Sequence, residues 1–75
     1  SVQPDEHIVK NEQYKALANS IKGLKENEQL IISLFYQDGL TFTEIGQVLG
    51  LTTSRISQIH KKAIFKLRNN LKEAL

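Results

Sequence analysis

The 75-residue chain has no cysteine, no methionine and no tryptophan, and only one proline. The lack of cysteine excludes disulfides and thiolate metal sites, and it fits a reducing compartment. The lack of methionine indicates that the sequence is processed or is a fragment of a longer one. No apolar run approaches the ~20 residues of a membrane helix, and residues 2–6 are polar, unlike a signal peptide. With 40% apolar residues, one small globular domain is expected.

Groups that carry enzyme chemistry are also missing. The sequence has no Gly-rich phosphate loop, no cysteine nucleophile and no acid–base pair at a usable spacing. Of the two histidines, His7 is expected on a helix surface, and His60 at the edge of an apolar stripe, where a packed imidazole is the expected role. We therefore expect neither an enzyme nor a cofactor or metal site.

Helix signals become dense after Leu40. Thr41 and Glu44 have the spacing of a capping box, in which each residue satisfies a backbone amide near the other. Gly50 follows the helical apolar pattern, at the position where a helix end needs a residue tolerant of positive φ. Thr52 can then cap a further helix. A helix, a glycine turn and a second, basic helix form a helix-turn-helix, which makes DNA the first ligand to consider.

Four helices are predicted in all. They are expected within 1–23, where Pro4 suits the first turn and Gly23 ends the helix, and over 25–38, 41–49 and 53–72. The predicted fold is all-α: a single domain over 1–75, built as a small helical bundle with a C-terminal helix-turn-helix and a long recognition helix.

Helical periodicity also predicts which apolar side chains face the core. The expected set is Ile8, Tyr14, Leu17, Ala18 and Ile21 in the first helix, Leu30, Ile31, Leu34 and Phe35 in the second, Ile45, Val48 and Leu49 in the third, and Ile56, Ile59, Ala63 and Leu67 in the fourth. Phe65 falls on the exposed side of the fourth helix.

The charge is unevenly distributed. Residues 52–75 hold six basic residues and one acid, a net charge of +5, whereas residues 1–51 hold four lysines and seven acids, a net charge of −3. Basic residues at a helix C-terminus often do no more than complement its dipole, which accounts for residues 66–72. The helix dipole does not explain why all of the excess positive charge lies on the helix that would enter DNA.

At about 100° per residue, a set of polar side chains lies opposite the apolar stripe of this helix. Side chains near the start of a recognition helix reach base edges, and short polar groups or an amide can read them. The candidate base-reading residues are Thr53, Ser54, Ser57 and Gln58, and the candidate phosphate contacts are Thr41, Arg55, Lys61 and Lys62. A Ser- and Thr-rich helix start also serves capping alone, so either role is open for Thr53 taken by itself.

Residues 24–68 carry a family resemblance. They read LKENEQLIISLFYQDGLTFTEIGQVLGLTTSRISQIHKKAIFKLR, which resembles region 4 of bacterial RNA polymerase sigma factors. The run SLFYQDGLTFTEIGQVLGLTTSRISQIHKKA is similar to the flagellar or motility class. The likeness rests on LFY before the turn, LTxxEIG, and SRISQIH followed by KKAIFKLR.

The resemblance implies a bacterial, cytoplasmic domain that binds double-stranded promoter DNA at the −35 element. It also implies docking on the flap tip of the RNA polymerase β subunit, on the surface of the second and third helices, and binding by an anti-sigma factor. Carried over by position, base reading falls on Thr53, Ser54, Ser57 and Gln58, and phosphate contact on Thr41, Arg55 and Lys62.

Two departures from the family pattern matter, one at Thr53, Ser54 and Ser57 and the other at Lys25. Housekeeping sigma factors carry arginine and glutamate where this chain has small polar residues, and those long side chains read guanine and cytosine. Their loss, with Gln58 retained, predicts an A·T-rich site, in keeping with the TAAA-type element of the motility class. Lys25 replaces a usual capping residue, and a missing N-cap costs about 1 kcal/mol, so the second helix is expected to fray at its start.

Two other functions fit parts of the sequence. A stand-alone helix-turn-helix regulator has the same helix order and would bind paired half-sites as a dimer. A pure protein-interaction module would use the acidic front half and the second helix, and the basic fourth helix would be incidental.

Overall fold

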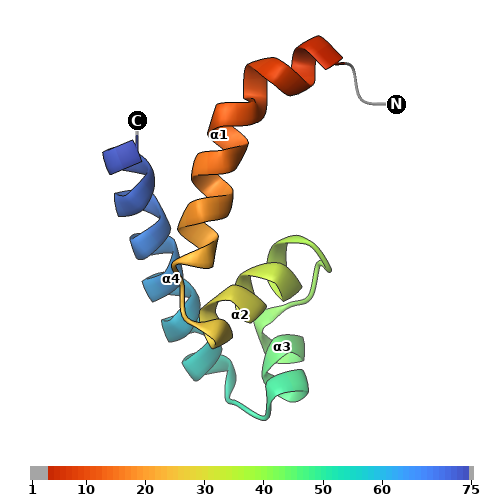
Figure 1. Ribbon diagram of the computed structural model, residues 1–75. Coiled ribbons are helices and arrows are strands. Elements are labelled where there is room, and N and C mark those ends of the chain that lie inside the picture. Colours follow the sequence, from red (N-terminus) through yellow and green to blue (C-terminus); the bar gives the residue numbers. More distant parts are fainter. Residues whose placement is uncertain (1–3, 75) are drawn as a thin grey trace.

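The computed structural model describes residues 4–74, with the side chains at position 12 and positions 14–72. It contains four helices: α1 (Pro4–Lys22), α2 (Glu26–Tyr36), α3 (Phe42–Leu49) and α4 (Thr53–Ala74). The predicted all-α fold, with a helix-turn-helix and a long last helix, is confirmed. The other three helices all pack against α4. In Figure 1, α1 and the C-terminal part of α4 form two arms at the top, and α3 lies at the other end beside the start of α4.

The core consists of two clusters that share α4. The helix-turn-helix cluster holds Ile31, Ile45, Ile56 and Ile59, all at most 4% exposed, with five partly buried apolar neighbours around them. The α1-side cluster holds Leu24, Ile32, Ala63 and Leu67, against which Ile21 and Ile64 pack. The stripe predicted on the fourth helix is therefore confirmed, and it divides between the two clusters.

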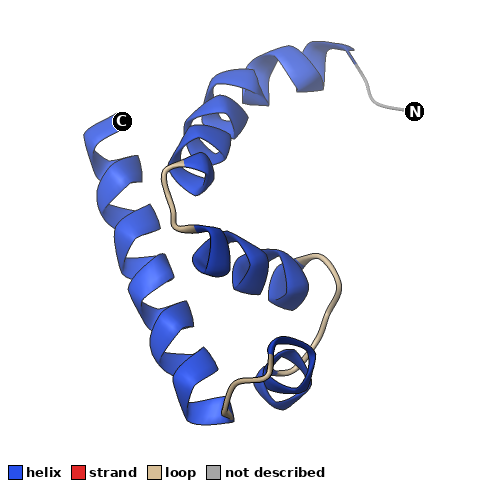
Figure 2. Cartoon of the chain, turned by 60° about the horizontal axis from the view of Figure 1, so that its bottom comes forward, coloured by secondary structure: helices blue, strands red, loops and turns tan. Residues whose placement is uncertain are grey.

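The apolar pattern was wrong at several positions. Five residues assigned to the core are exposed: Tyr14, Leu17, Ala18, Leu30 and Val48. In Figure 2, α1 diverges from the other helices toward the N-terminus, so the core covers Ile21 near the end of α1 more fully than the three exposed residues before it. Ile32 is buried in place of Leu30, because α2 contributes Ile31 to the helix-turn-helix cluster and the adjacent Ile32 to the α1-side cluster. Ile8 lies outside the described side chains.

An ion pair joins the start of α2 to α4. Glu28 is 2% exposed, and its carboxylate accepts hydrogen bonds from Lys66 Nζ at 3.0 and 3.1 Å. The same carboxylate accepts from the backbone N–H of Lys25 at 2.9 Å. The Lys25 side chain makes no capping bond, as expected, but Glu28 satisfies an amide at this helix start and fixes the helix to α4.

Close packing at the helix-turn-helix requires a glycine inside α3. A Cβ atom added at Gly46 would lie 2.5 Å from the carbonyl oxygen of Leu51, well inside van der Waals contact. The N–H of Leu51 donates to the Gly46 carbonyl oxygen at 2.9 Å. Gly50 ends α3 with φ of 71°, as predicted for the turn. These two glycines set the angle at which α4 leaves α3.

An aromatic cluster ties α2, α3 and α4 together. The ring centroid of Phe35 lies 4.8 Å from that of Tyr36, 4.9 Å from that of Phe42 and 5.2 Å from that of His60. The Tyr36 hydroxyl and His60 Nε2 are 3.0 Å apart and share a hydrogen bond. The half-buried imidazole is thus packed, as the sequence predicts, and it links the last turn of α2 to the middle of α4.

Candidate nucleic-acid interface

The first two turns of α4 present a polar face opposite the core. Ile56 and Ile59 are buried, at 0% and 4% exposed. The four candidate base-reading residues all lie exposed on the other side of the helix: Thr53, Ser54, Ser57 and Gln58. An amphipathic helix with short polar groups on its free face and one side fixed to the core has the form of a groove-reading element.

Side-chain hydrogen bonds define where α4 begins. The hydroxyl of Thr52 accepts from the backbone N–H of Arg55 at 3.1 Å, which makes Thr52 the predicted N-cap. One residue further on, the hydroxyls of Thr53 and Thr43 lie 3.2 Å apart. The start of α4 is therefore bonded both within its own first turn and to the start of α3.

The start of α3 carries the predicted capping box. Thr41 Oγ1 accepts from the N–H of Glu44 at 3.1 Å, and Glu44 Oε1 accepts from the N–H of Thr41 at 2.8 Å. The Thr41 hydroxyl hydrogen takes no part in this pair. It can donate to a phosphate oxygen beside the positive end of the helix.

The basic residues of α4 divide into free and bound ones. Arg55, Lys61 and Lys62 are exposed, so their charges are available to phosphates. Lys66 is not a solvated helix-end lysine, because Glu28 holds its ammonium group. Burial alone would raise the pKa of Glu28, but the hydrogen bonds from the Lys25 amide and Lys66, with the positive charge of Lys66, lower it. Sequence reasoning missed this pair because 38 residues separate its members.

The family model for "Sigma-70, region 4" matches residues 20–69. The chain belongs to the sigma-70 region 4 family. The match covers α2, α3 and the turn between them, the end of α1 and most of α4. It thus includes the helix-turn-helix and every candidate DNA-contacting residue.

Sequence identity to curated proteins indicates which class of sigma factor the chain resembles within this family. The chain is 57% identical over all 75 residues to the RNA polymerase sigma-D factor of Bacillus subtilis, of which it covers 30%. It is 41% identical over 66 residues, 87% of the chain, to the sigma factor FliA of Pseudomonas aeruginosa, covering 27% of that protein. With FliA of Salmonella typhimurium the identity is 38% over 68 residues, 91% of the chain and 28% of that protein.

These likenesses confirm the assignment to region 4 of a motility-class sigma factor. They give no support to a stand-alone dimeric regulator. The chain spans less than a third of the length of these relatives. No helix among the described residues is long and apolar enough to cross a membrane, and no metal-binding group of acids and histidines occurs among them.

This region 4 domain also has surface features that periodicity did not predict. An apolar groove lies between α1, α2 and α4, with a volume of about 330 Å³. Its apolar lining comes from Leu17, Ile21, Ile32, Tyr36, Ile64 and Leu67. Two of these lining residues, Leu17 and Tyr36, are exposed, at 38% and 57%.

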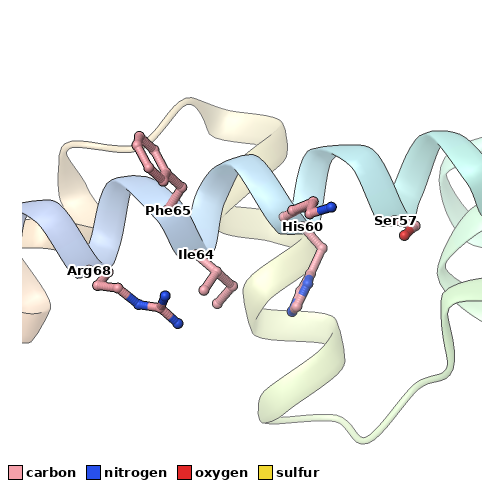
Figure 3. A pocket seen from close by; sticks show the side chains of 6 residues that line it. Ser57, His60, Ile64, Phe65 and Arg68 are labelled. Atoms are coloured by element: carbon pink, nitrogen blue, oxygen red, sulfur yellow. The ribbon is translucent and has the colours of Figure 1, made fainter.

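A second hollow follows α4 from Ser57, on the polar face, to Arg68. Figure 3 shows Ser57, His60, Ile64 and Arg68 along one side of the helix and Phe65 projecting from another. Phe65 is 64% exposed, as the helical pattern predicts. Burial lowers the pKa of His60, which keeps the imidazole uncharged against its aromatic neighbours near neutral pH.

Proposed function

We propose that this domain recognises the −35 promoter element and places the polar face of α4 in the DNA major groove. The observation that carries the proposal is the exposure of Thr53, Ser54, Ser57 and Gln58 on one face of a helix whose opposite face is buried. Gln58 can pair with an adenine through two hydrogen bonds, and the hydroxyl residues can bond a base or contact a thymine methyl. The domain directs the polymerase to a site and catalyses no reaction.

Phosphate contacts position the helix in this proposal. Arg55, Lys61 and Lys62 carry exposed charges on or beside the polar face, and Thr41 adds a hydroxyl at the start of α3. Each phosphate that is neutralised releases counterions, so affinity falls as salt rises. Four contacts are few for a DNA-binding protein, so the free domain is expected to bind weakly and to act when tethered to polymerase.

The small side chains at three of the four reading positions favour A·T pairs. Thr53, Ser54 and Ser57 lack the long charged groups that read guanine or cytosine. The expected site is therefore rich in A·T, like the TAAA-type element. A requirement for a G·C pair opposite Ser57 in a selection experiment would contradict this specificity.

The second proposed partner is the flap tip of the RNA polymerase β subunit. The sequence favoured the surface of α2 and α3 for this contact. The structure supports a different placement, in the groove between α1, α2 and α4, because six apolar side chains line it and it lies away from the start of α4. An anti-sigma factor is the third partner that membership of the motility class suggests.

DNA recognition is tested with two amide residues on the same face of α4. Gln58 and Asn69 are both exposed and lie about three turns apart. We expect Gln58→Ala to lose preference at one base pair by roughly fivefold to 100-fold, and Asn69→Ala to change none. The measurement is sequence selection from a duplex library by the sigma factor that carries this domain, assembled with core polymerase. Equal profiles for both variants would refute base reading by Gln58.

Docking is tested with two exposed apolar residues on different surfaces. Leu17 lies in the groove, whereas Val48, 64% exposed, lies on α3. An NMR titration with a flap-tip helix peptide should give saturable shifts that Leu17→Glu abolishes and Val48→Glu leaves intact. The reverse result would return the docking surface to α2 and α3. No binding by any variant would count against the polymerase contact itself.

A further inference from the structure

The hydroxyl groups of Thr43 and Thr53 form a hydrogen bond across the helix-turn-helix. Their Oγ1 atoms are 3.2 Å apart, and either can donate. Thr43 is the second residue of α3, and Thr53 is the first residue of α4. Both side chains are exposed, so the bond lies on the surface that the domain turns toward DNA in the function proposed above.

Thr53 lacks the restraint that a threonine has inside a helix. There, the hydroxyl bonds a backbone carbonyl one turn earlier, and this bond helps to select the χ1 rotamer. No helical turn precedes Thr53, because α4 begins at that residue. The contact with Thr43 replaces the missing restraint and fixes which way the hydroxyl and the methyl group of Thr53 point.

We propose that Thr43 is a positioning residue that sets the base preference of Thr53. The bond directs the Thr53 hydroxyl toward Thr43 on α3, so the methyl group is the part that this rotamer presents to a base. A methyl group recognises thymine through the C5-methyl in the major groove. The base pair opposite Thr53 is therefore selected by methyl–methyl contact, and Thr43 maintains that selection without contacting the base. This inference rests on the proposed role of Thr53 as a base reader.

Two substitutions at Thr43 distinguish the role of its hydroxyl group from the role of its branched shape. Thr43→Val removes the hydroxyl and keeps the branched side chain, and Thr43→Ser keeps the hydroxyl and loses the methyl group. Neither touches the Thr41–Glu44 capping box. Thermal unfolding followed by circular dichroism checks that both variants fold like the parent.

The experiment uses the sigma factor that carries this domain, assembled with core polymerase, and promoter duplexes of defined sequence. Selection with Thr53→Ala first identifies the base pair at which preference is lost. At that position thymine is then replaced by uracil, which lacks only the C5-methyl group. The parent and Thr43→Ser should prefer thymine by about fourfold, the factor that burial of one methyl-sized group contributes. Thr43→Val should bind the two duplexes equally.

Each contradicting result of this experiment overturns a different part of the proposal. A thymine preference that survives in Thr43→Val would overturn the positioning role and leave base reading by Thr53 standing. An equal loss of affinity for every duplex would make Thr43 a contact to the DNA backbone instead. If Thr53→Ala changes preference at no position, the proposed function fails at Thr53, and the inference about Thr43 fails with it.

Discussion

Replacement of Glu28 by Gln gives the strongest test of what holds α2 on α4. Glutamine has the size of glutamate and can still accept from the Lys25 N–H, so the change removes mainly the charge that faces Lys66. The ammonium of Lys66 lies 3.0 Å from the carboxylate, with its side chain 32% exposed against 2% for Glu28. The perturbation therefore acts on one partly screened ion pair, and the fold is otherwise unchanged.

The expected loss follows from this geometry. A hydrogen bond to a charged group contributes about 1.5–3 kcal/mol, and Lys66 recovers part of the loss because it can turn toward water. We expect the free energy of unfolding to fall by about 2 kcal/mol, which lowers the melting temperature by roughly 8–16 °C in a domain of this size. Urea unfolding followed by circular dichroism at neutral pH measures the change.

Acid provides an independent check of the same pair. The folded state lowers the pKa of Glu28 below its ordinary value of 4.5, so the unfolded chain binds the proton more readily. The stabilisation is complete above about pH 4.5 and disappears as the pH falls through the folded-state pKa. The stability gap between the parent and Glu28→Gln should therefore close in acid.

Glu26→Gln is the matched control, because Glu26 is an exposed acid in the same first turn of α2. Its substitution should change the free energy of unfolding by no more than about 0.5 kcal/mol. If Glu28→Gln is no more destabilising than this control, or if its gap persists unchanged in acid, the ion pair does not hold the two helices together.

Three further predictions concern the turn and the aromatic cluster. Gly46→Ala should lower the free energy of unfolding by about 1–3 kcal/mol, because the new Cβ meets the Leu51 carbonyl oxygen. It should also weaken DNA binding by tilting α4. An unchanged urea midpoint would contradict the predicted loss of stability. Thr52→Ala should cost about 1 kcal/mol through loss of the cap on α4, measured by thermal unfolding against Thr52→Ser, which should retain the cap. Burial lowers the pKa of His60, so the unfolded chain takes up the proton first and stability should fall as the pH drops below about 6.5. His60→Phe should lack this loss of stability below about pH 6.5 in urea titrations.

The sequence predicted α4 and both of its faces correctly because this helix has two strong, opposite requirements. Its apolar residues are buried by neighbours along most of the helix, and the polar side chains of its first turns stay exposed. The capping signals at Thr41, Gly50 and Thr52 also act within a few residues of one another. Local patterns of this kind can be recognised without knowledge of the rest of the fold.

Positions that depend on a distant partner were not predictable. Periodicity gives the direction in which a side chain points, but not whether another helix lies there, and for that reason Val48 and Leu30 were misplaced. The Glu28–Lys66 pair and the Thr43–Thr53 bond join separate helices, and no spacing rule connects their members. The assignment of DNA-contacting residues remains a prediction from the exposed polar face and the family likeness.

The division of the core along α4 limits how the length of this helix can change. Ile56 and Ile59 must face one cluster, and Ala63 and Leu67 the other. Inserting one residue between them would rotate the second pair by about 100° and turn it out of its cluster. Only insertions or deletions of nearly a whole turn, in steps of about 5.4 Å, keep both pairs in phase. The separation between the polar start of α4 and the groove between α1, α2 and α4 can therefore change only in discrete steps.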